Sequence, residues 1–236
     1  MIKYQTVKGV FGNGVLMFPE FSMSHDYKAQ YPGVGFGLTL ISGCQTSQQL
    51  PSELKLFKRK LLRKMRKREI LAQITERINI YANFFEQFGY DCPLFGHLKR
   101  TVNSGFPQYS LSVDAHFMAE MCAGILVAVT DFDRFEGKLM LDVATDGETC
   151  AGMGGREFIL KANEIVLRDE AGIVCVLAQG ADDKTRVSEQ TANVLFYAYA
   201  VPGIDSSYLK DGLEIAAETM VEFGKGQCEG LETYIP

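Results

Sequence analysis

The sequence lacks any apolar run of the roughly 18 residues that a membrane-spanning helix needs. It also lacks an N-terminal apolar stretch of the roughly 7 to 15 residues that a signal peptide carries. The six cysteines are scattered and form no close Cys-x-x-Cys pair, so neither a zinc site nor a disulfide framework is expected. We therefore expect a cytoplasmic protein with reduced thiols, no membrane partner, no metal site and no cofactor.

Familiar catalytic motifs are absent as well. The sequence contains no phosphate loop, dinucleotide fingerprint, nucleophile elbow or zincin helix. The three histidines, His25, His97 and His116, are far apart in sequence. A lone His on a helix, as expected for His116, is more often packed in a core than catalytic. The pattern of residues therefore leaves the catalytic residues unknown; Asp131 and Asp133 could act as acid or base, although capping of the next turn is the commoner use of such residues.

Length and composition are those of an ordinary globular protein. The chain has 236 residues, of which 47% are hydrophobic and 22% charged, enough to bury a sizeable core. No internal repeat and no low-complexity linker divides it, so we expect residues 1–236 to form a single domain. Helical periodicity dominates the first half and strand patterns the second half, which favours the α+β class.

The stretch 113–133 is the centre of the predicted fold. Val113, Phe117, Met121 and Gly124 follow a helical spacing and predict a helix that buries this face and ends at Gly124. The β-branched run that follows predicts a buried strand that ends at Asp131. Polar residues at the end of a buried strand often line a pocket, although capping of the next turn is the commoner use of such an Asp. We expect the helix at about 111–124 to pack on one mixed sheet containing 125–129, 173–177 and 194–200.

Basic residues are concentrated in one window. Between Lys55 and Arg100 there are twelve Lys and Arg against four acidic residues, a local charge of +8, whereas the rest of the chain carries −13. Apolar spacing predicts helices over 54–88 with a break between Met65 and Ile70. Two interpretations of the basic block remain open: a solvated helix face, or a surface that contacts the phosphates of tRNA or another RNA. The residues predicted for the second role are Lys58, Arg59, Arg63, Arg66 and Lys67.

Several motifs in order resemble one known family. They are the run VDAHFMAEMCAGILVAVTDFD, the later NEIVLRDEAGIVCVLAQGADDKTRVSEQTANVLF, and upstream Tyr31-Pro32-Gly33-Val34 and Phe88-Gly89. Over residues 24–223 the chain is similar to the editing and tRNA-binding module of the phenylalanyl-tRNA synthetase β chain, and more closely to its freestanding bacterial relatives. The resemblance implies a mixed, barrel-like β-sheet core flanked by helices.

The resemblance also implies a substrate pocket. Matching without gaps places the family's pocket His on Ala128 and its tyrosine-recognising Glu on Tyr197. A small residue near the path of the substrate falls on Gly180 or Ala181, and Asp131 completes the implied pocket. Because Ala and Tyr stand where the family has His and Glu, hydrolysis specific for tyrosine is not implied. The ligase activity of the synthetase lies in another domain, so this chain is not expected to charge tRNA.

Two functions follow as expectations. The first is a tRNA-binding module that hydrolyses mischarged aminoacyl-tRNA in trans, where positioning of a water on a labile ester is the main requirement. The second is a non-catalytic protein that binds a small aromatic or amino-acid-like ligand, or a protein partner, in the same pocket. The basic block favours the first function, because the second leaves it unexplained.

Overall fold

The computed structural model describes residues 18–46 and 51–236, and six α-helices lie within them. The helices are His25–Gln30 (α1), Ser52–Met65 (α2), Arg68–Glu86 (α3), Pro93–Ser104 (α4), Leu111–Ala123 (α5) and Ser207–Gly224 (α6). The strands are Phe21–Met23 (β1), Phe36–Ser42 (β2), Leu126–Asp131 (β3), Leu139–Val143 (β4), Thr149–Gly152 (β5), Arg156–Ile159 (β6), Ile165–Asp169 (β7), Gly172–Val176 (β8), Gly180–Ala181 (β9), Val194–Tyr199 (β10) and Gln227–Tyr234 (β11). None of the described helices combines the length and apolar character needed to cross a bilayer.

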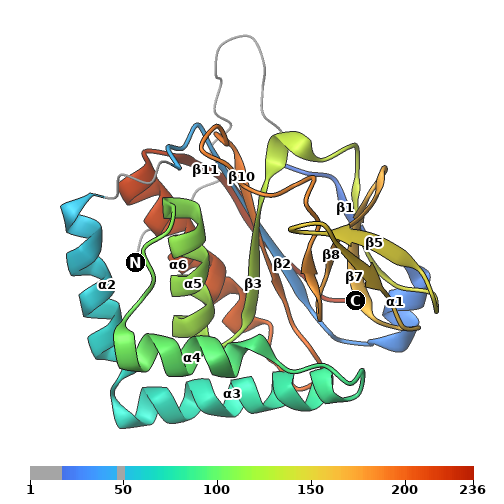
Figure 1. Cartoon of the computed structure of the whole chain (residues 1–236), viewed down its shortest axis with the longest axis horizontal. Coiled ribbons are helices and arrows are strands. Elements are labelled where there is room, and N and C mark those ends of the chain that lie inside the picture. The colour runs from blue at the N-terminus through green and yellow to red at the C-terminus, as the bar shows by residue number, and fades with distance from the viewer. Residues whose placement is uncertain (1–17, 47–50) are drawn as a thin grey trace.

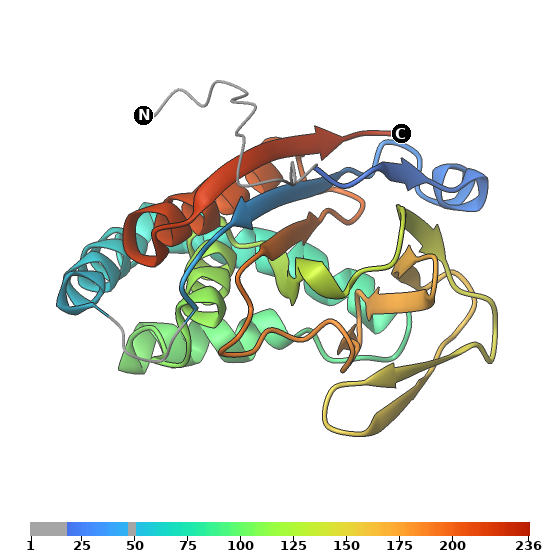
Figure 2. The ribbon, with the colours of Figure 1, turned by 90° about the horizontal axis from the view of Figure 1, so that it is seen from above.

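The strands form two larger sheets and one hairpin. One sheet has the antiparallel order β11-β2-β10-β3, and Figure 2 shows β11, β2 and β10 side by side. The second has the order β1-β4-β7-β8-β9, in which only the β1–β4 pairing is parallel, and β5 pairs with β6. The predicted α+β class is confirmed. Within the described residues the sheets stay open and do not close into a barrel, and the strand predicted at 173–177 lies in the second sheet, not in the sheet of β3 and β10.

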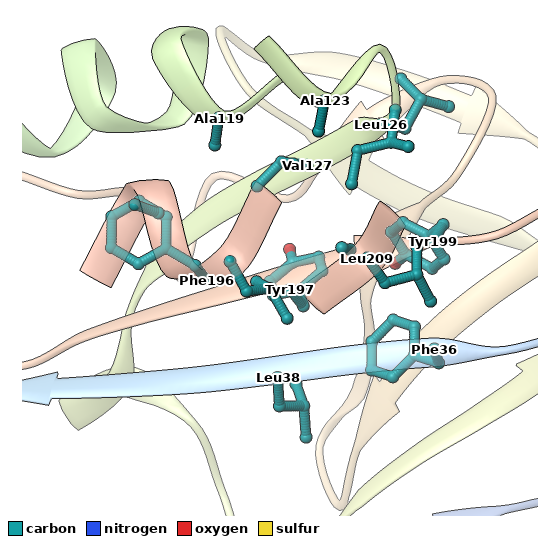
Figure 3. Packing of buried hydrophobic residues seen from close by; sticks show 14 of the residues in the cluster. Phe36, Leu38, Ala119, Ala123, Leu126, Val127, Phe196, Tyr197, Tyr199 and Leu209 are labelled. Carbon is teal, nitrogen blue, oxygen red and sulfur yellow. The ribbon is translucent and has the colours of Figure 1, made fainter. Parts of the chain in front are cut away.

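Helices α5 and α6 cover one face of the four-stranded sheet (Figure 1). Gly37 on β2 allows the close approach of α6, because a Cβ at this position would lie 2.7 Å from Leu213 Cδ1. The opposite face carries aromatic side chains of β2 and β10: the rings of Phe36 and Tyr199 are 5.0 Å apart, and Figure 3 shows them beside Tyr197. The sheet is therefore buried on both faces, which explains why β10 has no exposed residue.

Two helix boundaries lie where local chemistry predicts them. The apolar stripe of 54–88 breaks as expected, since α2 ends at Met65 and α3 begins at Arg68. Helix α5 ends at Gly124, whose φ of +65° is the left-handed conformation that glycine adopts without steric cost. This turn feeds the chain directly into β3 and brings α5 and β3 together as two walls of a cavity.

Candidate functional site

A pocket of about 630 Å³ lies between α5, β3 and the turn from β8 to β9. Its apolar walls include Val113 and Phe117 on α5, Leu126 on β3, and Leu177 and Val187 on the opposite side. Volume and lining are typical of sites for small molecules. The predicted stripe of α5 is thus partly wrong, because Val113 and Phe117 are only half-buried and face this α5–β3 pocket.

Three of the predicted substrate residues lie together in the α5–β3 pocket. Ala128 contributes from β3, and Gly180 and Ala181 contribute from β9. Gly180 has a φ of +110°, and a Cβ built there would meet no atom within 4 Å. The small side chains at these three positions leave room for a ligand to approach the backbone closely.

Asp131 does not line the α5–β3 pocket, contrary to the prediction. Its carboxylate accepts hydrogen bonds from Thr191 Oγ1 at 2.7 Å and from the backbone N–H of Asp133 at 3.2 Å. It contributes to a separate shallow hollow that also contains Lys184. Asp131 therefore caps the turn after β3, the commoner use of such a residue.

Tyr197 is not a lining residue either. It lies in the middle of the four-stranded sheet, paired with Ala128 on one side and Leu38 on the other, and is fully buried. Tyr199, two residues further along β10, lines the pocket in its place. The two tyrosines share a face of the strand, and sequence alternation alone does not show which of them reaches the cavity.

Two buried hydroxyl groups have no hydrogen-bond partner among the described residues, those of Tyr197 and Tyr199. Burial raises the pKa of both phenols well above the ordinary value, and the nearby Cys175 thiol adds to the effect. An unpartnered buried hydroxyl is costly. Tyr199 also lines the pocket, but its hydroxyl is itself buried beside the Cys175 thiol.

A buried carboxylate and two histidines form a cluster on the α5 wall. Glu120 is 2% exposed and lies 2.9 Å from His97 Nδ1 and 3.5 Å from His116 Nε2. Burial alone would raise the pKa of Glu120, but the imidazoles of His116 and His97 bring it below its ordinary value. Residues 18–46 and 51–236 contain no group of three or more His, Cys, Asp or Glu side chains arranged to hold a metal ion.

The sequence did not predict this cluster, because nothing in the spacing of His97 and His116 shows that α4 packs against α5. One signal was present. Glu120 follows His116 by four residues on one helix, the spacing at which side chains meet. The interpretation of His116 as an ordinary core residue is wrong, since its side chain is 18% exposed and lines the pocket.

Four of the five predicted tRNA-binding residues line another hollow, of about 400 Å³, at the end of α2 and its junction with α3. We call this hollow the basic groove; its basic residues are Arg59, Arg63, Arg66 and Lys67. All four side chains are exposed. The groove therefore presents four positive charges to solvent along the end of α2 and its junction with α3.

Lys58 lies elsewhere, and its prediction as an exposed phosphate contact is wrong. The residue is 6% exposed, and its ammonium group forms an ion pair with Asp114 and donates a hydrogen bond to the Pro107 carbonyl at 2.6 Å. The spacing contains a signal for this, because Leu54, Lys58 and Met65 fall on one side of the helix.

Comparisons with known proteins agree on one family. Residues 97–226 match the family model of the B3/4 domain. A segment of 95 residues is 25% identical to the phenylalanine–tRNA ligase beta subunit of Mycoplasma pneumoniae, covering 40% of this chain and 12% of that protein. A segment of 66 residues is 32% identical to the same subunit of Mycoplasma genitalium, covering 28% of this chain and 8% of that protein. The aligned segments thus span about a tenth of the length of these relatives.

Among solved structures, an N-terminal fragment of the phenylalanyl-tRNA synthetase beta-subunit from Pyrococcus horikoshii is similar, with a TM-score of 0.49 and 12% identity over 89% of this chain and 50% of that chain. The resemblance to this beta subunit, expected from the sequence motifs, is confirmed. The matched region covers more than half of the chain and includes α5, β3, β8 and β9, the elements that wall the α5–β3 pocket. This chain belongs to the B3/4 domain family.

Proposed function

We propose that this protein binds the aminoacylated end of a tRNA and hydrolyses the ester of a wrongly attached amino acid. The observation that carries the proposal is the α5–β3 pocket, whose apolar walls and volume of about 630 Å³ suit an amino-acid side chain together with the ester group. The relation to the beta subunit of a tRNA ligase supports tRNA as the partner. In this proposal residues 24–223 act as one domain, in line with a core cluster that extends from Met23 to Phe223.

Positioning is the main requirement of the proposed reaction. An aminoacyl ester is already reactive, so holding it beside a water molecule accounts for much of the rate increase. The open space at Gly180 allows the ester to approach the backbone. Neither Ala128 nor the buried Tyr197 offers a carboxylate or imidazole, so the proposal does not include selection of tyrosine by these two positions.

The basic groove is the proposed contact for the phosphates of the tRNA. Its four exposed cations lie on a chain of net charge −5, and such concentrated charge is stabilised by bound phosphates. A cytoplasmic location belongs to the same proposal. All six cysteines are free thiols, the state expected in a reducing compartment.

A non-catalytic ligand-binding protein is the second candidate. The mostly apolar lining of the pocket favours it, since such a lining also suits a small aromatic ligand. This candidate predicts binding to the pocket without hydrolysis of any aminoacyl-tRNA.

The test is a deacylation assay on a panel of mischarged tRNAs, with tRNA binding measured in parallel. Ala181→Leu places three extra carbon atoms in the pocket, and Ala162→Leu is the matched control at an exposed position. We expect the wild type and Ala162→Leu to hydrolyse at least one mischarged tRNA, and Ala181→Leu to lose that activity while it still binds tRNA. Hydrolysis of no substrate by the wild type would reject the proposal in favour of the non-catalytic candidate.

A further inference from the structure

Glu120 is held between two imidazoles at the wall of the α5–β3 pocket. His97 Nδ1 lies 2.9 Å from Glu120 Oε2, and His116 Nε2 lies 3.5 Å from Oε1. The pKa of Glu120 is below its ordinary value, so the side chain is a carboxylate, and both oxygens need donors because the group is buried. His97 Nδ1 is within hydrogen-bond distance of the carboxylate and His116 Nε2 is within ion-pair distance, so hydrogens on these two nitrogens are the arrangement that satisfies Glu120 best.

This arrangement favours the tautomer of His116 that carries its hydrogen on Nε2. In a neutral imidazole one nitrogen donates and the other has a free lone pair. With Nε2 directed at Glu120, Nδ1 holds the lone pair, and it forms no hydrogen bond to any residue of the described ranges. A carboxylate behind an imidazole also orients the ring and favours the protonated form once a proton is taken up.

The other polar groups of the pocket are poorer proton acceptors. Burial raises the pKa of the Cys175 thiol to about 11 and that of the Tyr199 phenol well above its ordinary value, so both are protonated at neutral pH. Arg186 remains charged and lies 3.6 Å from Asp183. Asp91 is solvent-exposed. Of the titratable groups that line the pocket, His116 alone combines a free lone pair with a buried carboxylate partner.

We propose that His116 is the general base of the hydrolysis, with Glu120 and His97 as positioning residues; this inference rests on the proposed function. His116 Nδ1 removes a proton from a water molecule as the water oxygen attacks the ester carbonyl carbon. The tetrahedral intermediate then breaks its bond to the ribose oxygen, and that oxygen receives the proton from the imidazolium. The products are the free amino acid and the tRNA with its ribose hydroxyl restored, so atoms and charges balance.

The experiment measures kcat and KM for the mischarged tRNA found in the deacylation panel, from about pH 5 to about pH 9. His116→Gln should lower kcat by about 10²- to 10⁴-fold, with little change in KM, and should remove the decline of activity at acid pH. Glu120→Gln should lower kcat with little change in KM, because the ring of His116 loses the carboxylate that orients it. His25→Gln, whose side chain is 96% exposed and distant in sequence, is the matched control and should behave as the wild type.

Because the cluster is partly buried, a rescue experiment is needed to separate loss of the base from loss of the fold. Added imidazole should restore part of the activity of His116→Gly, which a merely structural role would not allow. If the wild type is active but His116→Gln stays within about threefold with an unchanged pH profile, His116 is not the base, and the proposed function stands. If the wild type hydrolyses no mischarged tRNA, the proposed function fails and the role of His116 fails with it.

Discussion

Replacement of Lys58 by Met should strongly destabilise the protein. The ammonium group of Lys58 and the carboxylate of Asp114 form a buried ion pair, with side chains 8% and 0% exposed. Met has a similar length but no charge, so the variant leaves the Asp114 carboxylate without its counterion. Loss of one partner of a buried pair costs about 3–5 kcal/mol. At roughly 2–4 °C per kcal/mol for a chain of this size, Tm should fall by about 6–20 °C.

The loss of stability caused by Lys58→Met should depend on pH. Burial raises the pKa of Asp114, and Lys58 opposes that rise, so Lys58→Met raises the pKa further. A carboxyl whose pKa is raised in the folded state stabilises the fold when protonated, and this stability is lost as the pH rises through the folded pKa. The difference in unfolding free energy between Lys58→Met and the wild type should therefore shrink as the pH is lowered from about 7 toward about 5.

Urea denaturation of a double variant tests the cause. Asn at position 114 carries no charge but can still accept the 3.0 Å hydrogen bond from the Tyr109 N–H, so Lys58→Met with Asp114→Asn should recover at least half of the loss. Lys60→Met, on the exposed side of the same helix, should change stability by less than about 0.5 kcal/mol. The reasoning is refuted if Lys58→Met costs under about 1 kcal/mol, or if the double variant is no more stable than the single one.

Three further outcomes are expected. Replacement of the four basic-groove residues by Glu should reduce the slope of log K, the association constant for tRNA, against log salt by about 2.8–3.6, because each phosphate contact contributes roughly 0.7–0.9. Wild-type binding that does not depend on salt would contradict this prediction. The Arg168 guanidinium lies 2.6 Å from Glu148 and holds the pKa of that carboxyl below its ordinary value. The pair therefore stabilises the fold at pH values above the pKa that Glu148 has in the unfolded chain. This stability is lost as the pH falls through the pKa of Glu148 in the folded protein. Urea titrations between about pH 3 and about pH 6 should accordingly show a weaker loss of stability on acidification for Arg168→Met than for the wild type; equal losses would argue against the pair. Burial raises the pKa of the Cys44 and Cys175 thiols to about 11. Both thiols should therefore react slowly with iodoacetamide in the native protein at neutral pH and quickly in denaturant. Fast labelling of the native protein, measured by mass spectrometry, would contradict the burial of these thiols.

Local sequence signals predicted the break between α2 and α3 and the end of α5, because the cause of each boundary is local. The Met65–Arg68 break follows from the shift of the apolar stripe, and the end of α5 follows from Gly124. The pairing of strands was harder to predict from the sequence. The segment 173–177 has the same buried pattern as β10, and only long-range contacts assign it to a different sheet.

The candidate site was predicted in part. Ala128, Gly180 and Ala181 came from the resemblance and lie in one pocket. The choice between Tyr197 and Tyr199 depends on how far the second sheet covers β10, which no local pattern encodes. The pairing of His97 with Glu120 likewise depends on the packing of α4 against α5.

The buried pair between Lys58 and Asp114 joins the helix of the basic groove to the helix that forms a wall of the α5–β3 pocket. Two rigid helices bonded in this way keep a constant separation between the outer cations and the cavity. Under the proposed function, a tRNA that contacts the basic groove and places its aminoacylated end in the pocket must match this separation. The proposal therefore predicts that an RNA whose phosphates lie at another distance from its reactive end contacts only one of the two places at a time.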